Sequence, residues 1–106
     1  MAFGRWYPLD EAADNAPAGP GVLQVRLASG LIDYPTGKSA MIHYEAAADL
    51  SQAVAALARA HPTRDWLCRF ADTAPGTGAA PEANAMLNEL LTSFRRRFGA
   101  PPALPD

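Results

Sequence analysis

Gly37, Lys38 and Ser39 form a triplet that also ends the phosphate-binding loop of nucleotide-hydrolysing proteins, so phosphate chemistry is considered first. The complete loop has the pattern G-x-x-x-x-G-K-[ST], because its first glycine begins the backbone wrap that points N–H groups at the phosphates. Ile32 occupies the position of that first glycine, and no clear helix start follows Ser39. We therefore interpret the triplet as a turn rather than as a nucleotide site.

Three side chains in and around the triplet could still take part in chemistry. Lys38 could contact a phosphate, although a lysine after a turn glycine is usually only solvated. His43 could transfer a proton, although a histidine without an identified carboxylate partner is more often structural or exposed. Tyr34 is equally ambiguous, because a strand-end tyrosine commonly has a half-buried ring and a hydroxyl in water. Both interpretations stay open for all three residues.

The composition predicts one small domain in a reducing compartment. The chain has 106 residues, a net charge of −2 and a pI of about 5.6, which argues against a single broad cationic surface for nucleic acid. Cys68 is the only cysteine, which excludes an internal disulfide and a multi-cysteine zinc site. No apolar run approaches the ~20 residues needed to cross a bilayer, and no signal-peptide pattern is present. We expect a cytoplasmic protein without a membrane partner and of undetermined oligomeric state.

The first part of the chain predicts an arm and then a β-hairpin. Residues 1–20 form the arm, because a Pro- and Gly-rich stretch ends any helix there after a turn or two. Apolar residues then alternate with polar ones, which is the pattern of a half-buried strand. The alternating apolar positions are Leu23, Val25 and Leu27. Gly30 offers a turn, and residues 31–34 predict the second strand of the hairpin.

The middle of the chain predicts a helix from about Leu50 to Ala60. Asp49 followed by Gln52 resembles a helix cap, and Pro62 ends the pattern. The residues between Ser39 and Asp49 are interpreted as a separate short helix or a loop.

A third strand and a long terminal helix complete the predicted elements. Trp66, Cys68 and Phe70 alternate within residues 65–72, and a flexible loop is predicted at residues 73–80. Pro81 suits a first helical turn, and an apolar stripe continues to Phe98. The order strand, strand, helix, strand, helix predicts an α+β fold with a small, three-stranded, mostly antiparallel sheet and flanking helices, within a single domain of residues 21–106.

This order and two short motifs resemble a GIY-YIG domain. Gly21-Val22-Leu23 stands where the family has Gly-Ile/Val-Tyr, and Tyr34 to Ser39 stands where it has Tyr-Ile/Val-Gly and a small or basic residue. The resemblance implies metal-dependent hydrolysis of phosphodiester bonds. It makes Tyr34, Lys38 and His43 the catalytic candidates, and Glu82 or Glu89 the ligand of Mg²⁺ or Mn²⁺.

Three differences between this sequence and the GIY-YIG pattern argue against catalysis. Leu23 replaces the first tyrosine, the second motif has one residue too many, and no arginine lies between His43 and Ala48. Loss of the cation that offsets phosphate charge is expected to cost orders of magnitude in rate, and Glu82 is also explained as a helix-start charge. We therefore expect a non-catalytic binding or adaptor domain, without a cofactor, that recognises a protein or nucleic-acid partner. The alternative is a divergent metal-dependent GIY-YIG endonuclease.

Overall fold

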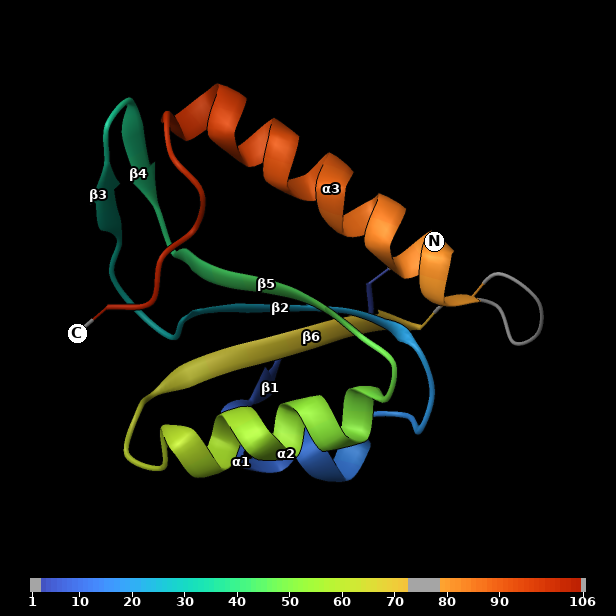
Figure 1. Ribbon diagram of the computed structural model, residues 1–106. Helices are drawn as coiled ribbons and strands as arrows, with labels where there is room; N and C mark the ends of the chain where they lie inside the picture. Colours follow the sequence, from blue (N-terminus) through green and yellow to red (C-terminus); the bar gives the residue numbers. More distant parts are fainter. Residues whose placement is uncertain (1–2, 73–78, 106) are drawn as a thin grey trace.

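A computed structural model of the chain describes residues 3–72 and 79–105 and shows an α+β fold in three layers (Figure 1). The elements are β1 (Tyr7–Pro8), α1 (Leu9–Asn15), β2 (Gly21–Leu27), β3 (Ile32–Tyr34), β4 (Gly37–Ser39), β5 (Met41–Ala47), α2 (Leu50–Ala60), β6 (Trp66–Asp72) and α3 (Ala79–Phe98). A sheet forms the middle layer, α1 and α2 lie on one face of it, and α3 lies on the other face. The predicted α+β class is confirmed.

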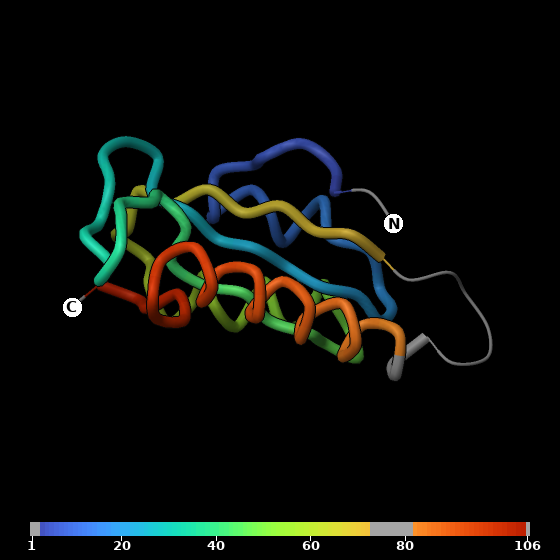
Figure 2. Tube along the Cα trace, turned by 90° about the horizontal axis from the view of Figure 1, so that it is seen from above, coloured from blue at the N-terminus to red at the C-terminus, as the bar shows by residue number. Residues whose placement is uncertain are grey.

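The main sheet has four strands in the order β1, β6, β2, β5, and all neighbouring strands are antiparallel. Figure 2, viewed from the side of α3, shows β6, β2 and β5 following one another across the sheet. A second, two-stranded sheet consists of β3 and β4. The main sheet therefore has four strands rather than the three predicted, because β1 and β5 join it and the predicted strand of residues 31–34 lies in the second sheet.

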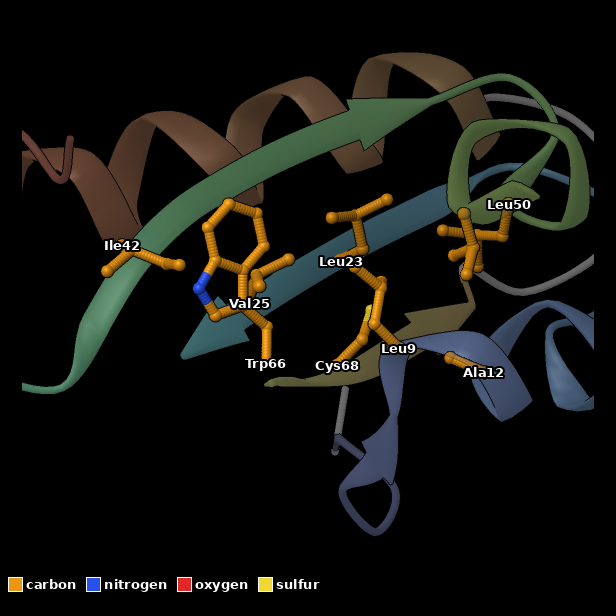
Figure 3. Close-up of a cluster of buried hydrophobic side chains, with 9 residues drawn as sticks. Leu9, Ala12, Leu23, Val25, Ile42, Leu50, Trp66 and Cys68 are labelled. Atoms are coloured by element: carbon orange, nitrogen blue, oxygen red, sulfur yellow. The ribbon is translucent and has the colours of Figure 1, made fainter. Parts of the chain in front are cut away.

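The central strand β2 is buried on both faces. Leu23 and Val25 lie on the side of α1 and α2, within a cluster of buried apolar side chains (Figure 3). That cluster consists of Leu9, Ala12, Leu23, Val25, Ile42, Leu50, Val54, Trp66 and Cys68. Val22 and Gln24 alternate to the other face, where 0% and 3% of their surface is exposed. Helices are needed on both sides of the sheet to achieve this burial.

The predicted hairpin partner of β2 is wrong. β2 pairs with β5, from Gly21 opposite Ala47 to Arg26 opposite Met41, whereas residues 32–34 pair with residues 37–39. The stretch before Asp49, interpreted from its composition as a short helix or a loop, therefore contains the strand β5. Burial explains the choice, because β5 contributes the fully buried Ile42 and β3 has no buried residue. Tertiary pairing overrides the helix propensity of the alanines here.

The other predicted elements agree with the structure. α2 begins and ends at the predicted residues, and the carboxylate of Asp49 accepts hydrogen bonds from Gln52 N at 3.3 Å and from the Ser51 hydroxyl at 2.7 Å. These bonds lower the pKa of Asp49. β6 and α3 also form where alternation and the apolar stripe predict them, except that α3 begins at Ala79, two residues inside the predicted loop. Residues 73–78 of the predicted flexible loop lie outside the described residues.

The carboxyl end of α3 is attached to the tip of the β3–β4 hairpin. Thr36 donates its N–H to Phe98 O at 3.0 Å and its hydroxyl to Arg97 O at 2.7 Å. Gly99 ends the helix with φ +83°, and its N–H donates to Arg95 O at 2.8 Å. The hairpin therefore satisfies carbonyls that a helix end leaves without partners.

The arm of residues 1–20 contributes to the core. Leu9 and Ala12 of α1 belong to the buried cluster, and Tyr7 of β1 stacks on Phe70 with a centroid distance of 5.8 Å.

Across residues 3–72 and 79–105, no helix combines the length and the apolar character that a membrane span requires.

We predict that Gly21→Ala lowers the free energy of unfolding by roughly 1–3 kcal/mol, because overpacking forces neighbouring atoms to move. An added Cβ would meet the backbone oxygen of Ala71 and would lie 2.6 Å from Leu50 Cδ1. Urea denaturation followed by circular dichroism measures the change. Gly4→Ala is the matched control, since its nearest contact would be 3.9 Å away. Equal losses in the two variants would contradict this explanation.

We also predict that Cys68 makes the fold sensitive to alkali. Burial, aided by the charge of Glu45, raises the pKa of the Cys68 thiol from 9.0 to about 12. The thiol therefore contributes stability that is fully present below pH 9.0 and is lost as the pH rises towards 12, because only the unfolded chain ionises in that window. Unfolding free energy measured across this range is expected to fall more steeply for the original chain than for Cys68→Ala. If the unfolding free energy falls with pH at the same rate in both chains, the Cys68 thiol does not contribute to the sensitivity to alkali.

Candidate functional site

Tyr34 lies at the junction between the β3–β4 hairpin, β5 and α3. Its hydroxyl donates to Met41 O at 2.7 Å and accepts from Ala103 N at 3.3 Å. Its ring packs against Phe94 and Phe98, with centroid distances of 5.0 and 5.8 Å. All of these contacts hold parts of the fold together.

The Gly37-Lys38-Ser39 triplet is the strand β4. An added Cβ at Gly37 would lie 3.3 Å from Phe98 Cδ1, so the glycine allows the end of α3 to pack closely. Lys38 lies 3.5 Å from Asp33 in an exposed ion pair, and Ser39 Oγ accepts from Met41 N at 3.1 Å. The strand β5, and not a helix, follows the triplet directly, which agrees with the interpretation that it is not a P-loop.

His43 lies on the opposite side of the sheet from α3. Its cross-strand partner is Val25, whose side chain belongs to the core under α1 and α2, and directly paired residues share a face. His43 Nε2 lies 2.9 Å from Glu45 Oε1, and both side chains are partly exposed. The histidine therefore has a carboxylate partner, which sequence alone did not identify.

Glu82 and Glu89 are exposed residues of α3, on the other side of the sheet from His43. A helical rise of about 1.5 Å per residue places Glu82 roughly 18 Å along the helix axis from Phe94, the ring that touches Tyr34. Within the described ranges, no three His, Cys, Asp or Glu side chains gather closely enough to hold a metal ion. The five candidate residues therefore do not converge on one site.

A different group of side chains does converge, on the face of the sheet that also carries α3. We call it the arginine–aromatic surface, and it consists of Phe3, Trp6, Arg26 and Arg69 with Gln24 beside them. Arg69 Nε donates to Gln24 Oε1 at 2.7 Å, which places Arg69 on the face of Gln24. The guanidinium carbons of Arg69 and Arg26 lie 4.5 and 4.9 Å from the Trp6 ring centroid. A second ring, that of Phe3, lies 4.8 Å from Arg69.

The two guanidinium groups have no carboxylate partner in the part of the chain that the structure describes. In residues 3–72 and 79–105, the ion pairs join Lys38 to Asp33 and His43 to Glu45, and neither involves Arg26 or Arg69. Arg26 Nε is buried and has no hydrogen-bond partner among the described residues. Both residues are only partly exposed, so water screens them incompletely. Charges that are partly withdrawn from water are normally paired with an opposite charge, whereas these two contact aromatic rings and, for Arg69, the amide of Gln24.

The electrostatics of this surface reflect the same shortage of negative charge. Burial lowers the pKa of the Arg69 guanidinium, the neighbouring Tyr44 opposes that change, and the nearby Arg26 adds to it. Burial likewise raises the pKa of Tyr44, which pairs with Gln24 across the sheet. An anion bound between the two arginines would relieve their mutual repulsion and supply the missing acceptors.

Sequence reasoning did not select the arginine–aromatic surface, although one signal was present. Gln24 and Arg26 are the polar positions of the first predicted strand, which alternation makes half-buried, and Arg69 lies on the second face of the strand predicted within residues 65–72. In the structure they lie on the two inner strands, β2 and β6, and α3 packs against β2. Polar residues at such positions usually have a specific partner.

Comparisons with known proteins add no functional information, because no family model, no curated protein and no solved structure matches the chain.

We predict that Tyr34→Phe lowers the free energy of unfolding by roughly 1–3 kcal/mol, because it leaves the partly buried Met41 carbonyl without its donor. Thermal and urea denaturation measure the loss. Tyr7→Phe is the matched control, because the Tyr7 hydroxyl makes no hydrogen bond to the described part of the chain. A Tyr34→Phe variant as stable as Tyr7→Phe would contradict the structural role assigned to this hydroxyl.

Proposed function

We propose that this chain is a non-catalytic binding domain whose arginine–aromatic surface recognises an acidic segment of a protein partner. One observation carries the proposal: Arg26 and Arg69 are held together on the sheet by Trp6 and have no carboxylate partner among the described residues. A partner carboxylate would accept charge-assisted hydrogen bonds from the terminal guanidinium nitrogens.

The residue types favour a protein partner over a nucleic acid. Trp and Arg are the residues most enriched among the energetically dominant positions of protein interfaces. The chain as a whole has a net charge of −2, whereas tight binding to a phosphate backbone usually needs many cations along an extended track. Two arginines supply a local contact that suits one or two carboxylates.

Preorganisation also supports binding. The bond from Arg69 Nε to Gln24 fixes the plane of one guanidinium, and the contacts with Trp6 and Phe3 restrict both arginines further. Side chains that are already ordered lose less entropy when a ligand binds.

The GIY-YIG resemblance and the endonuclease alternative stay predictions. Among the described residues, Glu82 and Glu89 lie on the other side of the sheet from His43, so the alternative has no assembled metal site to support it. Both glutamates are exposed enough to be changed without harm to the fold. Incubation with labelled DNA and RNA in the presence of Mn²⁺ tests it directly. Metal-dependent cleavage that disappears in Glu82→Gln or Glu89→Gln would favour the endonuclease and overturn the non-catalytic proposal.

Fluorescence anisotropy tests the binding proposal. The probes are a fluorescein-labelled peptide of alternating Glu and Ser residues, its Gln and Ser counterpart, and a labelled single-stranded oligonucleotide. We expect binding of the acidic peptide alone, weakened at least about tenfold in Arg26→Gln and in Arg69→Gln, which corresponds to ~1.4 kcal/mol. High salt is expected to weaken it further.

Arg59→Gln provides the matched control, because Arg59 is an exposed arginine of α2 on the other side of the sheet. It is expected to bind the acidic peptide as the original chain does. Preference for the oligonucleotide would assign this surface to nucleic acid instead, and an equal loss in Arg59→Gln would reduce the effect to net charge. Circular dichroism verifies that each variant is folded.

A further inference from the structure

The outer edge of β5 is the open edge of the main sheet. At the opposite end of the sheet, the short β1 pairs with β6, whereas no strand of the described ranges pairs with the outer side of β5 (Figure 2). β5 is seven residues long, Met41–Ala47. Met41 is already occupied, because its N–H donates to Ser39 Oγ and its carbonyl accepts from the Tyr34 hydroxyl. The residues after Met41 present backbone N–H and C=O groups on this edge that another strand can pair with.

β5 lacks the residues that most often protect an edge strand, and its register against β2 shifts only at its beginning, between His43 and Met41. Monomeric proteins commonly place lysine or proline on an exposed edge strand to prevent pairing with another chain. β5 has the sequence MIHYEAA and contains neither residue type. The edge of β6 differs, since Pro8 of β1 lies there and has no N–H to donate.

The order of polar residues on β5 is complementary to itself when the strand is reversed. In an antiparallel pairing centred on Tyr44, His43 of one copy faces Glu45 of the other, and the same pair forms again across the two-fold axis. Within one chain, His43 Nε2 already lies 2.9 Å from Glu45 Oε1, so both side chains share one face. In this pairing each His43 therefore has two glutamate neighbours, Glu45 of its own chain and Glu45 of the other copy. No histidine faces a histidine, and no glutamate faces a glutamate. A register centred on His43 or on Glu45 would place like residues opposite each other, which is unfavourable for the glutamates.

We propose that a second copy of this chain pairs with the outer edge of β5 in antiparallel register about Tyr44, giving a two-fold symmetric dimer with a continuous eight-stranded sheet. The partner is the same chain, because the His43 and Glu45 pattern fits its own reverse. The axis of such a dimer is perpendicular to the sheet. It therefore keeps the two α3 helices on one face, and the two arginine–aromatic surfaces point in the same direction.

Light scattering during size-exclusion chromatography tests the dimer with the full chain, over roughly a hundredfold range of protein concentration, since a single edge gives a small interface. We expect the mass to rise from 11.2 kDa towards twice that value as the concentration increases. His43→Glu places like charges opposite each other across the axis, and so does the double variant His43→Lys with Glu45→Lys. Each is expected to stay monomeric alone, and a mixture of the two is expected to form a mixed dimer in native mass spectrometry.

Glu89→Lys is the control for a change of charge, because Glu89 is exposed on α3, which lies on the face of the sheet opposite His43 and Glu45. It is expected to dimerise as the original chain does. A mass that stays at 11.2 kDa at every concentration overturns the proposal, and so does a dimer that both charge variants preserve. Failure of the two variants to combine, while each remains folded by circular dichroism, overturns the assigned register.

Discussion

Burial of β2 on both of its faces is the constraint on which the rest of the structure depends. Leu23 and Val25 require cover from α1 and α2, whereas Val22 and Gln24 require it from α3. The helices on the two faces are held in different ways. On the face of α1 and α2, apolar packing holds them against the sheet. On the other side, α3 must also be held at its far end, where Thr36 binds its last carbonyls. The hairpin of β3 and β4 therefore acts as an anchor for a helix rather than as part of the main sheet.

Local patterns predicted the elements whose signals do not depend on distant residues. Alternation gave β2 and β6, the Asp49 cap gave the start of α2, and the apolar stripe with Gly99 gave the extent of α3. β5 was missed because its alanines and glutamate favour a helix locally, and only pairing with β2 makes a strand favourable. The wrong hairpin partner followed from the same error, since the nearest β-rich segment replaced the true one. Loop-closure entropy favours such local pairing, but burial of Ile42 outweighs it.

The candidate site was predictable only in part, for a related reason. Residues chosen by a resemblance to hairpin motifs, such as Tyr34 and Lys38, lie where the hairpin lies, and the structure gives Tyr34 contacts that explain it as a structural residue. His43 has a carboxylate partner two residues away, which becomes visible once residues 41–47 are known to be a strand. Arg26 and Arg69 are far apart in sequence, and the register of β2 against β6 brings them together. That register is part of the tertiary structure, and the spacing of residues along the chain does not predict it.

The arginine–aromatic surface and the open edge of β5 have a common physical origin. Each is a place where the described part of the fold leaves a group without a partner: Arg26 Nε lacks an acceptor, the two guanidiniums lack a carboxylate, and the outer side of β5 lacks a neighbouring strand. Groups of this kind lower the stability of an isolated domain, because desolvation is not fully offset by new bonds. A partner that supplies the missing groups recovers that free energy on binding. Two copies joined at β5 would present two such surfaces on the same face of the sheet, and a partner with two acidic segments would bind them with a gain in effective concentration. The proposed dimer would therefore strengthen the proposed recognition of an acidic partner.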